Sequence, residues 1–90
     1  MRAIVNVLGV DCPGIIAKIS TALYECNANI LDISQTVMGE DMFVMTMLGD
    51  LQGINTSFGD LQKKLESVGQ ELGMQIRLQR EEIFKSMHRI

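Results

Sequence analysis

The chain has little of what most catalytic and metal-binding proteins use: no tryptophan, one histidine, two cysteines, and aromatic residues at only 4% of its 90 positions. Cys12 and Cys26 are far apart in sequence and have no further cysteines beside them, so neither a zinc framework nor a CxxC redox pair can be formed. A single histidine, His88, fits a surface or interface residue better than a catalyst. We therefore predict no catalytic residue, no metal site and no cofactor.

Positive charge is also scarce, since eight Lys and Arg against eleven Asp and Glu give a net charge of -3. Such a chain has no basic field to draw it to nucleic acid or to an anionic membrane. No segment approaches the roughly 20 apolar residues of a membrane helix, and Met1–Asn6 lacks the pattern of a signal peptide. These absences predict a cytoplasmic protein with reduced cysteines that contacts neither nucleic acid nor membrane directly.

Apolar residues, in contrast, make up 47% of the chain. A chain of this length buries only about 60 to 65% of its unfolded surface, so its small interior cannot absorb that much apolar surface. The composition therefore predicts a homo-oligomer, a dimer or a tetramer.

The hydrophobic periodicity predicts six elements. They are strands over 2–8, 29–38, 42–48 and 74–79, and helices from Asp11–Gly14 to Cys26 and from Ser57 to Leu72. Ser57 and Asp60 have the spacing of a capping box, and Gly73 suits a helix C-cap. This order predicts a ferredoxin-like βαββαβ α+β fold, with a four-stranded antiparallel sheet and two helices on one face. A short C-terminal helix is expected over 81–90.

The strand Met42–Leu48 is apolar on both of its faces. Helices cover one face of such a sheet, and the other normally meets water, so a second subunit or the chain's own tail is expected to cover it. We assign the oligomer interface to residues of this strand and of the tail, namely Phe43, Met45, Met47, Phe84 and Met87.

The segment Asp11-Cys12-Pro13-Gly14 leads directly into the first helix. Free N–H groups and the positive end of the helix dipole favour a carboxylate or phosphate there, and Gly14 would let a ligand approach the backbone. A purely structural interpretation is also open, in which Asp11 caps the helix, Pro13 takes its first position and Gly14 permits a turn. Cys12 could be a reactive thiol, but without a base nearby in sequence a plain loop residue is the simpler interpretation.

Asn29-Ile30 opens the second strand. If the sheet edges of two subunits pair, this point lies near the first loop of the neighbour. Asn29 could then donate to a ligand carboxylate, or it could simply bond its own backbone.

Together these segments resemble the ACT domain, a family of small ligand-sensing regulatory modules. Gly9–Ile16 resembles the D-x-P-G-I/V first loop of that family, and Asn27–Ile30 resembles its N-I segment. The stretches 29–35 and 83–90 resemble, more narrowly, small stand-alone prokaryotic ACT proteins related to glycine-cleavage-system transcriptional repressors. We expect an ACT-like domain over 1–80 and a helical extension over 81–90 that packs on the domain or on a partner subunit.

The resemblance implies that an amino acid or similar small metabolite binds between two domains. The site would combine one domain's first loop, Asp11, Cys12, Pro13 and Gly14, with the start of the other domain's second strand, Asn29 and Ile30. The histidine that some members place just before this loop is absent, since Gly9 and Val10 occupy those positions.

Three other functions found on this fold fit the residues poorly. An acylphosphatase-like enzyme presents an Arg in its first loop, and Gly9–Gly14 contains none. An RNA-recognition motif needs exposed aromatic and basic residues on its central strands, and a copper chaperone needs CxxC. Two functions remain: a ligand-responsive regulatory module, and a ligand-free oligomerisation or adaptor domain that acts through an unidentified protein partner.

Overall fold

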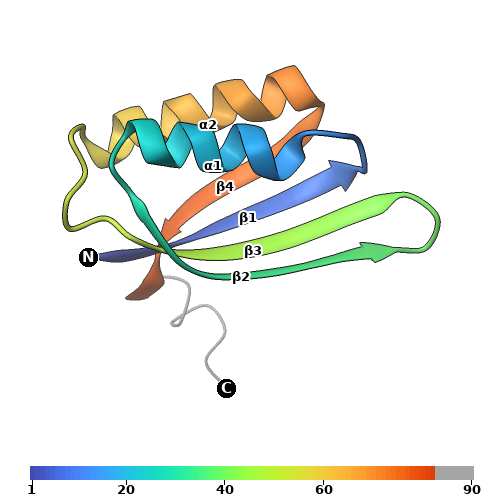
Figure 1. The fold of residues 1–90 in the computed structure, drawn as a ribbon, viewed down its shortest axis with the longest axis horizontal. Helices are drawn as coiled ribbons and strands as arrows, with labels where there is room; N and C mark the ends of the chain where they lie inside the picture. Colours follow the sequence, from blue (N-terminus) through green and yellow to red (C-terminus); the bar gives the residue numbers. More distant parts are fainter. Residues whose placement is uncertain (83–90) are drawn as a thin grey trace.

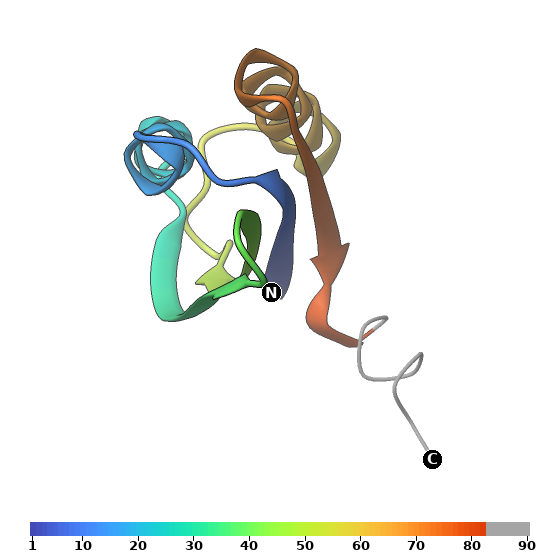
Figure 2. The same cartoon turned by 90° about the vertical axis from the view of Figure 1, so that its right-hand side faces the viewer.

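The computed structural model describes residues 1–82. The elements follow in the order β1 (Arg2–Val10), α1 (Ile15–Glu25), β2 (Asn29–Met38), β3 (Met42–Asp50), α2 (Phe58–Leu72) and β4 (Met74–Arg80). Both helices lie over one face of the sheet (Figure 1), and the turned view separates the helix layer from the strand layer (Figure 2). The expected ferredoxin-like α+β fold is therefore confirmed.

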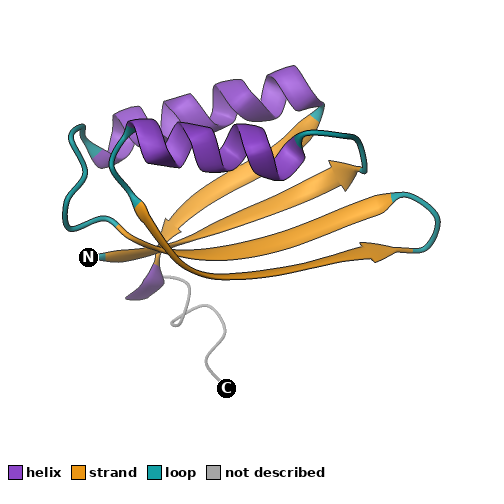
Figure 3. Ribbon diagram, viewed as in Figure 1, coloured by secondary structure: helices purple, strands orange, loops and turns teal. Residues whose placement is uncertain are grey.

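The four strands pair in the order β2-β3-β1-β4, and each neighbouring pair is antiparallel (Figure 3). β1 and β3 are therefore central, whereas β2 and β4 form the two edges. Met38 and Met42 form the last pair of the β2–β3 hairpin, and the turn between them contains Gly39 at a φ of 64°. The register of β2 on β3 shifts between Ile30 and Asp32, as at a β-bulge.

Helix α2 begins and ends as its sequence predicts. The Ser57 hydroxyl oxygen accepts a hydrogen bond from the Asp60 N–H at 3.0 Å, and Gly73 ends the helix with a φ of 70°. These two local signals set the length of the longer covering helix.

Helix α1 begins at Ile15 rather than at Pro13, which corrects one part of the structural interpretation. Gly14 occupies the cap position in the left-handed region, at a φ of 85°, and no side chain caps the helix. Asp11 and Pro13 therefore lie in the loop before the helix, because the turn at Gly14 separates them from its first residue.

The core lies between the helices and the sheet. Its most deeply buried large side chains are Val7, Ile19, Met45, Met47, Leu61 and Leu65. Every strand except β2 contributes buried residues, because β2 extends beyond the cover of the helices and is exposed along most of its length.

Phe43, Met45 and Met47 belong to this core, and their assignment to an oligomer interface was wrong. Their exposed fractions are 6%, 1% and 1%, so their own chain already covers them. A strand that is apolar on both faces does not reveal which face the helices cover, because the side chains alternate with a period of two. Phe84 and Met87 lie outside the described residues, as does the rest of the expected tail from residue 83, so their role stays a prediction.

Candidate functional site

A hollow of about 500 Å³ opens where the first loop enters α1, and we call it the loop hollow. Its lining residues are Asp11, Cys12, Gly14, Ile15, Ile16, Ala17, Gln35, Thr36, Val37 and Phe43. The hollow therefore lies between the start of α1 and the second half of β2, beside an edge of the sheet.

The backbone at the start of α1 supplies hydrogen-bond donors to this hollow. The N–H of Lys18 donates to the carbonyl oxygen of Gly14 at 3.0 Å, which is the first bond of the helix. The N–H groups of Ile15, Ile16 and Ala17 precede that bond, so no carbonyl within the helix accepts from them. Because no side chain caps α1, these donors and the helix dipole favour a bound carboxylate or phosphate.

The remaining lining combines apolar walls with two kinds of polar group. Ile15 and Phe43 are buried, while Ile16 and Val37 leave apolar surface exposed. The carboxylate of Asp11 adds a negative group at the same hollow. A few convergent polar groups on an apolar wall are typical of small-molecule sites.

Gly14 and Gly9 hold the first loop in place in different ways. A Cβ at Gly14 would meet no atom within 4 Å, so the backbone there is open to close approach. A Cβ at Gly9 would lie 2.4 Å from the Met74 sulfur and 3.2 Å from the Gly73 carbonyl oxygen, so a side chain there would require the Met74 side chain to shift. The Asp11 N–H donates to the Asp41 carbonyl oxygen at 2.7 Å and ties the loop to the β2–β3 hairpin.

The structure brings part of the predicted ligand-binding set together. Asp11, Cys12 and Gly14 line the loop hollow, and Pro13 is exposed in the same loop. Asn29 and Ile30 lie at the other end of β2, where Asn29 pairs with Asp50. The seven residue steps from Asn29 to Thr36 span about 23 Å along a strand, so one chain does not place these two groups in one site.

Sequence reasoning missed the part of the hollow that β2 and β3 provide. The pattern did contain a usable signal, because a hairpin turning at Gly39 pairs Val37 with Phe43. Antiparallel pairing of the first strand then sets Gly9 opposite Phe43. The end of β1 and the second half of β2 must therefore meet on either side of Phe43.

The start of β2 is anchored by side-chain amides at the opposite end of the sheet. Asn27, at a φ of 59°, donates from Nδ2 to the Gly53 carbonyl oxygen at 2.8 Å. Asn55 donates from Nδ2 to the Glu25 carbonyl oxygen at 3.1 Å. Asn29 follows this anchored turn, so its backbone position is well defined although its side chain is exposed.

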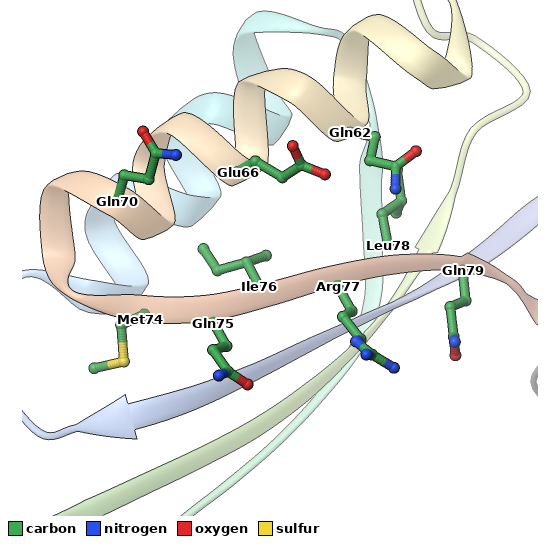
Figure 4. Close-up of a pocket in the computed structure, with 9 residues that line it drawn as sticks. All are labelled: Gln62, Glu66, Gln70, Met74, Gln75, Ile76, Arg77, Leu78 and Gln79. Atoms are coloured by element: carbon green, nitrogen blue, oxygen red, sulfur yellow. The ribbon is translucent and has the colours of Figure 1, made fainter.

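A second hollow of about 660 Å³ is a groove between α2 and the edge strand β4. Figure 4 shows the α2 side chains Gln62, Glu66 and Gln70 above that strand. The N–H groups in the middle of a helix are already paired, so this groove offers side-chain amides but no free helical donors. The loop hollow is for this reason the stronger candidate site.

On the outer surface of the two helices, ion pairs border a smaller hollow of about 300 Å³. Lys18 pairs with Glu71, and Lys64 pairs with Glu25 at 2.9 Å. The hydrogen bond that Lys64 donates to the Glu25 carboxylate raises the pKa of Lys64 above its ordinary value of 10.5. Both pairs link α1 to α2, and both are open to solvent.

The family model of the ACT domain matches residues 2–79. The chain belongs to the ACT domain family. A UPF0237 protein from Methanocaldococcus jannaschii is 53% identical to this ACT domain over 89 residues, which are 99% of this chain and 98% of that protein. An ACT domain protein from Streptococcus pneumoniae superimposes with a TM-score of 0.80 at 36% identity, over 94% of both chains. The predicted resemblance is thus confirmed over nearly the whole chain.

Two further structures contain a similar domain within a longer chain. The regulatory subunit of aspartate kinase from Thermus thermophilus, in its ligand-free form, has a TM-score of 0.68 at 28% identity, over 87% of this chain and 50% of that one. A candidate glycine cleavage system transcriptional repressor shares the fold, with a TM-score of 0.74 at 16% identity, over 86% and 44%. ACT domains are typically regulatory, ligand-binding domains rather than catalytic ones. Over residues 1–82, no helix is long and apolar enough to cross a membrane.

Proposed function

We propose that this ACT domain is a small stand-alone regulatory module that binds an amino acid, or a metabolite of the same charge pattern, at a subunit interface. The observation that carries the proposal is the loop hollow, where the uncapped start of α1 and the Asp11 carboxylate border one space of about 500 Å³. The module changes a partner's activity because the ligand stabilises one assembled form over another.

The polar groups of the hollow suit a zwitterion. The ligand carboxylate accepts from the N–H groups of Ile15, Ile16 and Ala17. The ligand ammonium lies beside the Asp11 carboxylate, which favours a positive charge. The apolar walls then receive the ligand's side chain, so Ile16 and Val37 select for its size.

The proposed site is completed by a second subunit paired along β2. This edge strand is ten residues long and contains no Pro or Lys. Pro and Lys are residues that often protect an edge strand from pairing with another chain. An antiparallel β2–β2 pair centred on its middle sets Asn29 of the partner subunit beside Val37 and Met38, at the mouth of the hollow. The amide of Asn29 can then donate to the ligand carboxylate.

An adaptor without a small-molecule ligand is the competing function. It is favoured by the exposed apolar residues on the helix-free face of the sheet, such as Leu8 and Met42. The two functions differ in one measurable respect, since only the regulatory module gains stability from a small ligand.

The test is thermal unfolding of the full chain with each of the twenty amino acids and with a few purine and folate-type metabolites. A ligand at 100 times its dissociation constant adds about 2.7 kcal/mol to stability. We expect a rise in Tm with at least one amino acid, and its loss in both Asp11→Asn and Asn29→Ala. Gln70→Ala, in the α2–β4 groove, is the matched control that keeps the rise.

No change in Tm with any of these compounds would contradict the proposal and favour the adaptor. A rise that survives in Asp11→Asn but not in Gln70→Ala would move the site to the α2–β4 groove.

A further inference from the structure

The helix wall of the α2–β4 groove carries a regular stripe of polar side chains. Gln62, Glu66 and Gln70 follow one another at steps of four residues, so they lie on one side of α2 (Figure 4). Their spacing along the helix is about 6 Å. Side chains on one face of an extended chain repeat every second residue, or about every 6.7 Å. An extended segment lying along the groove can therefore set one side chain against each of the three.

The strand wall repeats this arrangement on the other face of the sheet. Gln75, Arg77 and Gln79 alternate with the buried residues of β4, so they point to the helix-free side of the sheet, which we call the open face. Each wall thus has one charged residue between two glutamines. Within residues 1–82, none of these six side chains forms a hydrogen bond or an ion pair. Their polar groups are therefore available to a ligand.

The backbone of β4 is unpaired along its outer side. β4 is an edge strand, and within residues 1–82 it pairs only with β1. Alternate residues of an antiparallel strand direct their N–H and C=O groups to opposite sides, so one set points away from β1. The register with β1 has no bulge, and β4 contains no Pro or Lys that would hinder pairing. This edge can therefore accept a further strand.

Two contacts between α2 and β4 mark the ends of the groove. At one end the layers come closest, because a Cβ at Gly69 would lie 2.8 Å from the Met74 carbonyl oxygen. At the other end the Arg80 guanidinium lies 5.2 Å from the centre of the Phe58 ring. The lining part of the strand, from Met74 to Gln79, spans about 17 Å, which is the length of about five or six residues of an extended chain.

We propose that this groove binds an extended segment of a partner protein, which joins the sheet beside β4 as a fifth strand. Successive residues of such a segment point to opposite faces. The residue beside Ile76 points toward α2, where Figure 4 shows Glu66 above Ile76. The next residue, beside Arg77, points to the open face. Charge complementarity therefore selects a segment in which a Lys or Arg is adjacent to an Asp or Glu.

A second copy of the chain does not have this complementarity. Arg77 is the middle residue of β4, so an antiparallel β4–β4 pair centred there sets two Arg77 side chains directly opposite each other. The two α2 helices would lie on the same side of the joined sheet, each presenting Glu66 to the other. The chain's own residues 83–90 contain no acidic residue to face Arg77.

This interface goes beyond the proposed function and does not depend on it. The loop hollow lies between α1 and β2, beside the other edge of the sheet. The groove supplies a surface through which the domain reaches a protein partner, whether or not a small ligand binds at the loop hollow.

The experiment titrates the full chain with the peptide Thr-Val-Thr-Glu-Lys-Thr-Val-Thr, blocked at both ends, and follows the backbone amides by nuclear magnetic resonance. We expect the amide signals of β4 to shift, and the exchange of its outward N–H groups with solvent to slow. The same peptide with Pro in place of both Val residues should bind at least about tenfold more weakly, because Pro cannot donate a hydrogen bond to β4.

A charge reversal tests the recognition of the peptide. Glu66→Lys should weaken binding about tenfold, because it sets two positive charges against each other. Glu40→Lys, at an exposed position in the β2–β3 turn, makes the same change in net charge and should keep the wild-type dissociation constant. Glu66→Lys should also bind the peptide with Glu in place of Lys about tenfold more tightly than the wild type does, and damage to the fold cannot give such a gain.

No change at the β4 amides with about 1 mM peptide, or equal binding by the wild type and Glu66→Lys, would overturn the proposal. Two results with the free chain would also overturn it. Slow exchange of the outward β4 amides that is lost on dilution would make a second copy the occupant. Slow exchange that is lost in a chain ending at residue 82 would make the chain's own tail the occupant.

Discussion

The two faces of the sheet contain similar side chains but have different surroundings. Val5 and Met45 on the helix-covered face are 2% and 1% exposed, whereas Leu8 and Met42 on the open face are 44% and 39% exposed. The same strands supply both sets, because neighbouring residues of a strand point to opposite faces. Burial therefore depends on the layer above a strand and not on the composition of the strand.

Methionines on the two faces give the largest contrast. Met45→Ala leaves a cavity in a packed core and should lower the free energy of unfolding by about 2 to 5 kcal/mol. Met42→Ala should lower it by less than about 1 kcal/mol in dilute solution, because Met42 is already partly in water. Urea unfolding at matched concentrations measures both, and equal losses would contradict the assignment of the faces.

Glycines in α2 test how closely the covering layer must approach the sheet. A Cβ at Gly69 would lie 2.8 Å from the Met74 carbonyl oxygen, so Gly69→Ala should push α2 off β4 and cost about 1 to 3 kcal/mol. Gly59→Ala meets only the Ser57 oxygen at 4.0 Å and should raise stability by about 0.5 kcal/mol through helix propensity. Thermal unfolding should give shifts of opposite sign, and a stabilised Gly69→Ala would show that the two layers are not in close contact there.

The cap of the covering helix has a smaller effect. Ser57→Ala removes the acceptor for the Asp60 N–H and should cost about 1 kcal/mol in chemical denaturation. Ser67→Ala, at an exposed position inside α2, is the control and should change stability by less than about 0.5 kcal/mol. An equally large loss of stability in Ser67→Ala would show that the Ser57 cap has no special effect on the stability of the chain.

The ion pair above the helices should have the smallest effect, and it depends on pH. The folded-state pKa of Lys64 lies above the unfolded value, so the stabilisation is complete below 10.5 and is lost as pH rises through the raised pKa. The Tm difference between the wild type and Lys64→Gln should therefore shrink on going from neutral pH to about pH 12. A difference that does not change with pH would show that the Glu25 hydrogen bond is not the cause.

Local signals were sufficient where one residue and its near neighbours decide the structure. Ser57 and Asp60 cap α2 as their spacing predicts, and Met74, Ile76 and Leu78 are buried on one face of β4. The same approach failed at the first loop, because the turn at Gly14 separates Asp11 and Pro13 from the helix. Three of the six predicted ligand-binding residues line the loop hollow, and the part played by Asn29 and Ile30 stays a proposal that needs a second subunit.

Sequence alone was enough for the order of the elements and the position of the first loop, since periods of 2 and 3.6 and cap residues are local properties. It was also enough for the family resemblance, which the segments Gly9–Ile16 and Asn27–Ile30 carry. The folded chain was needed to place Phe43, Met45 and Met47 under the helices, and to bring Asp11 and Val37 to the same hollow. Both outcomes depend on strand register and on which face the helices cover. Those are contacts between distant residues, and a pattern with a period of two allows either face to be the covered one.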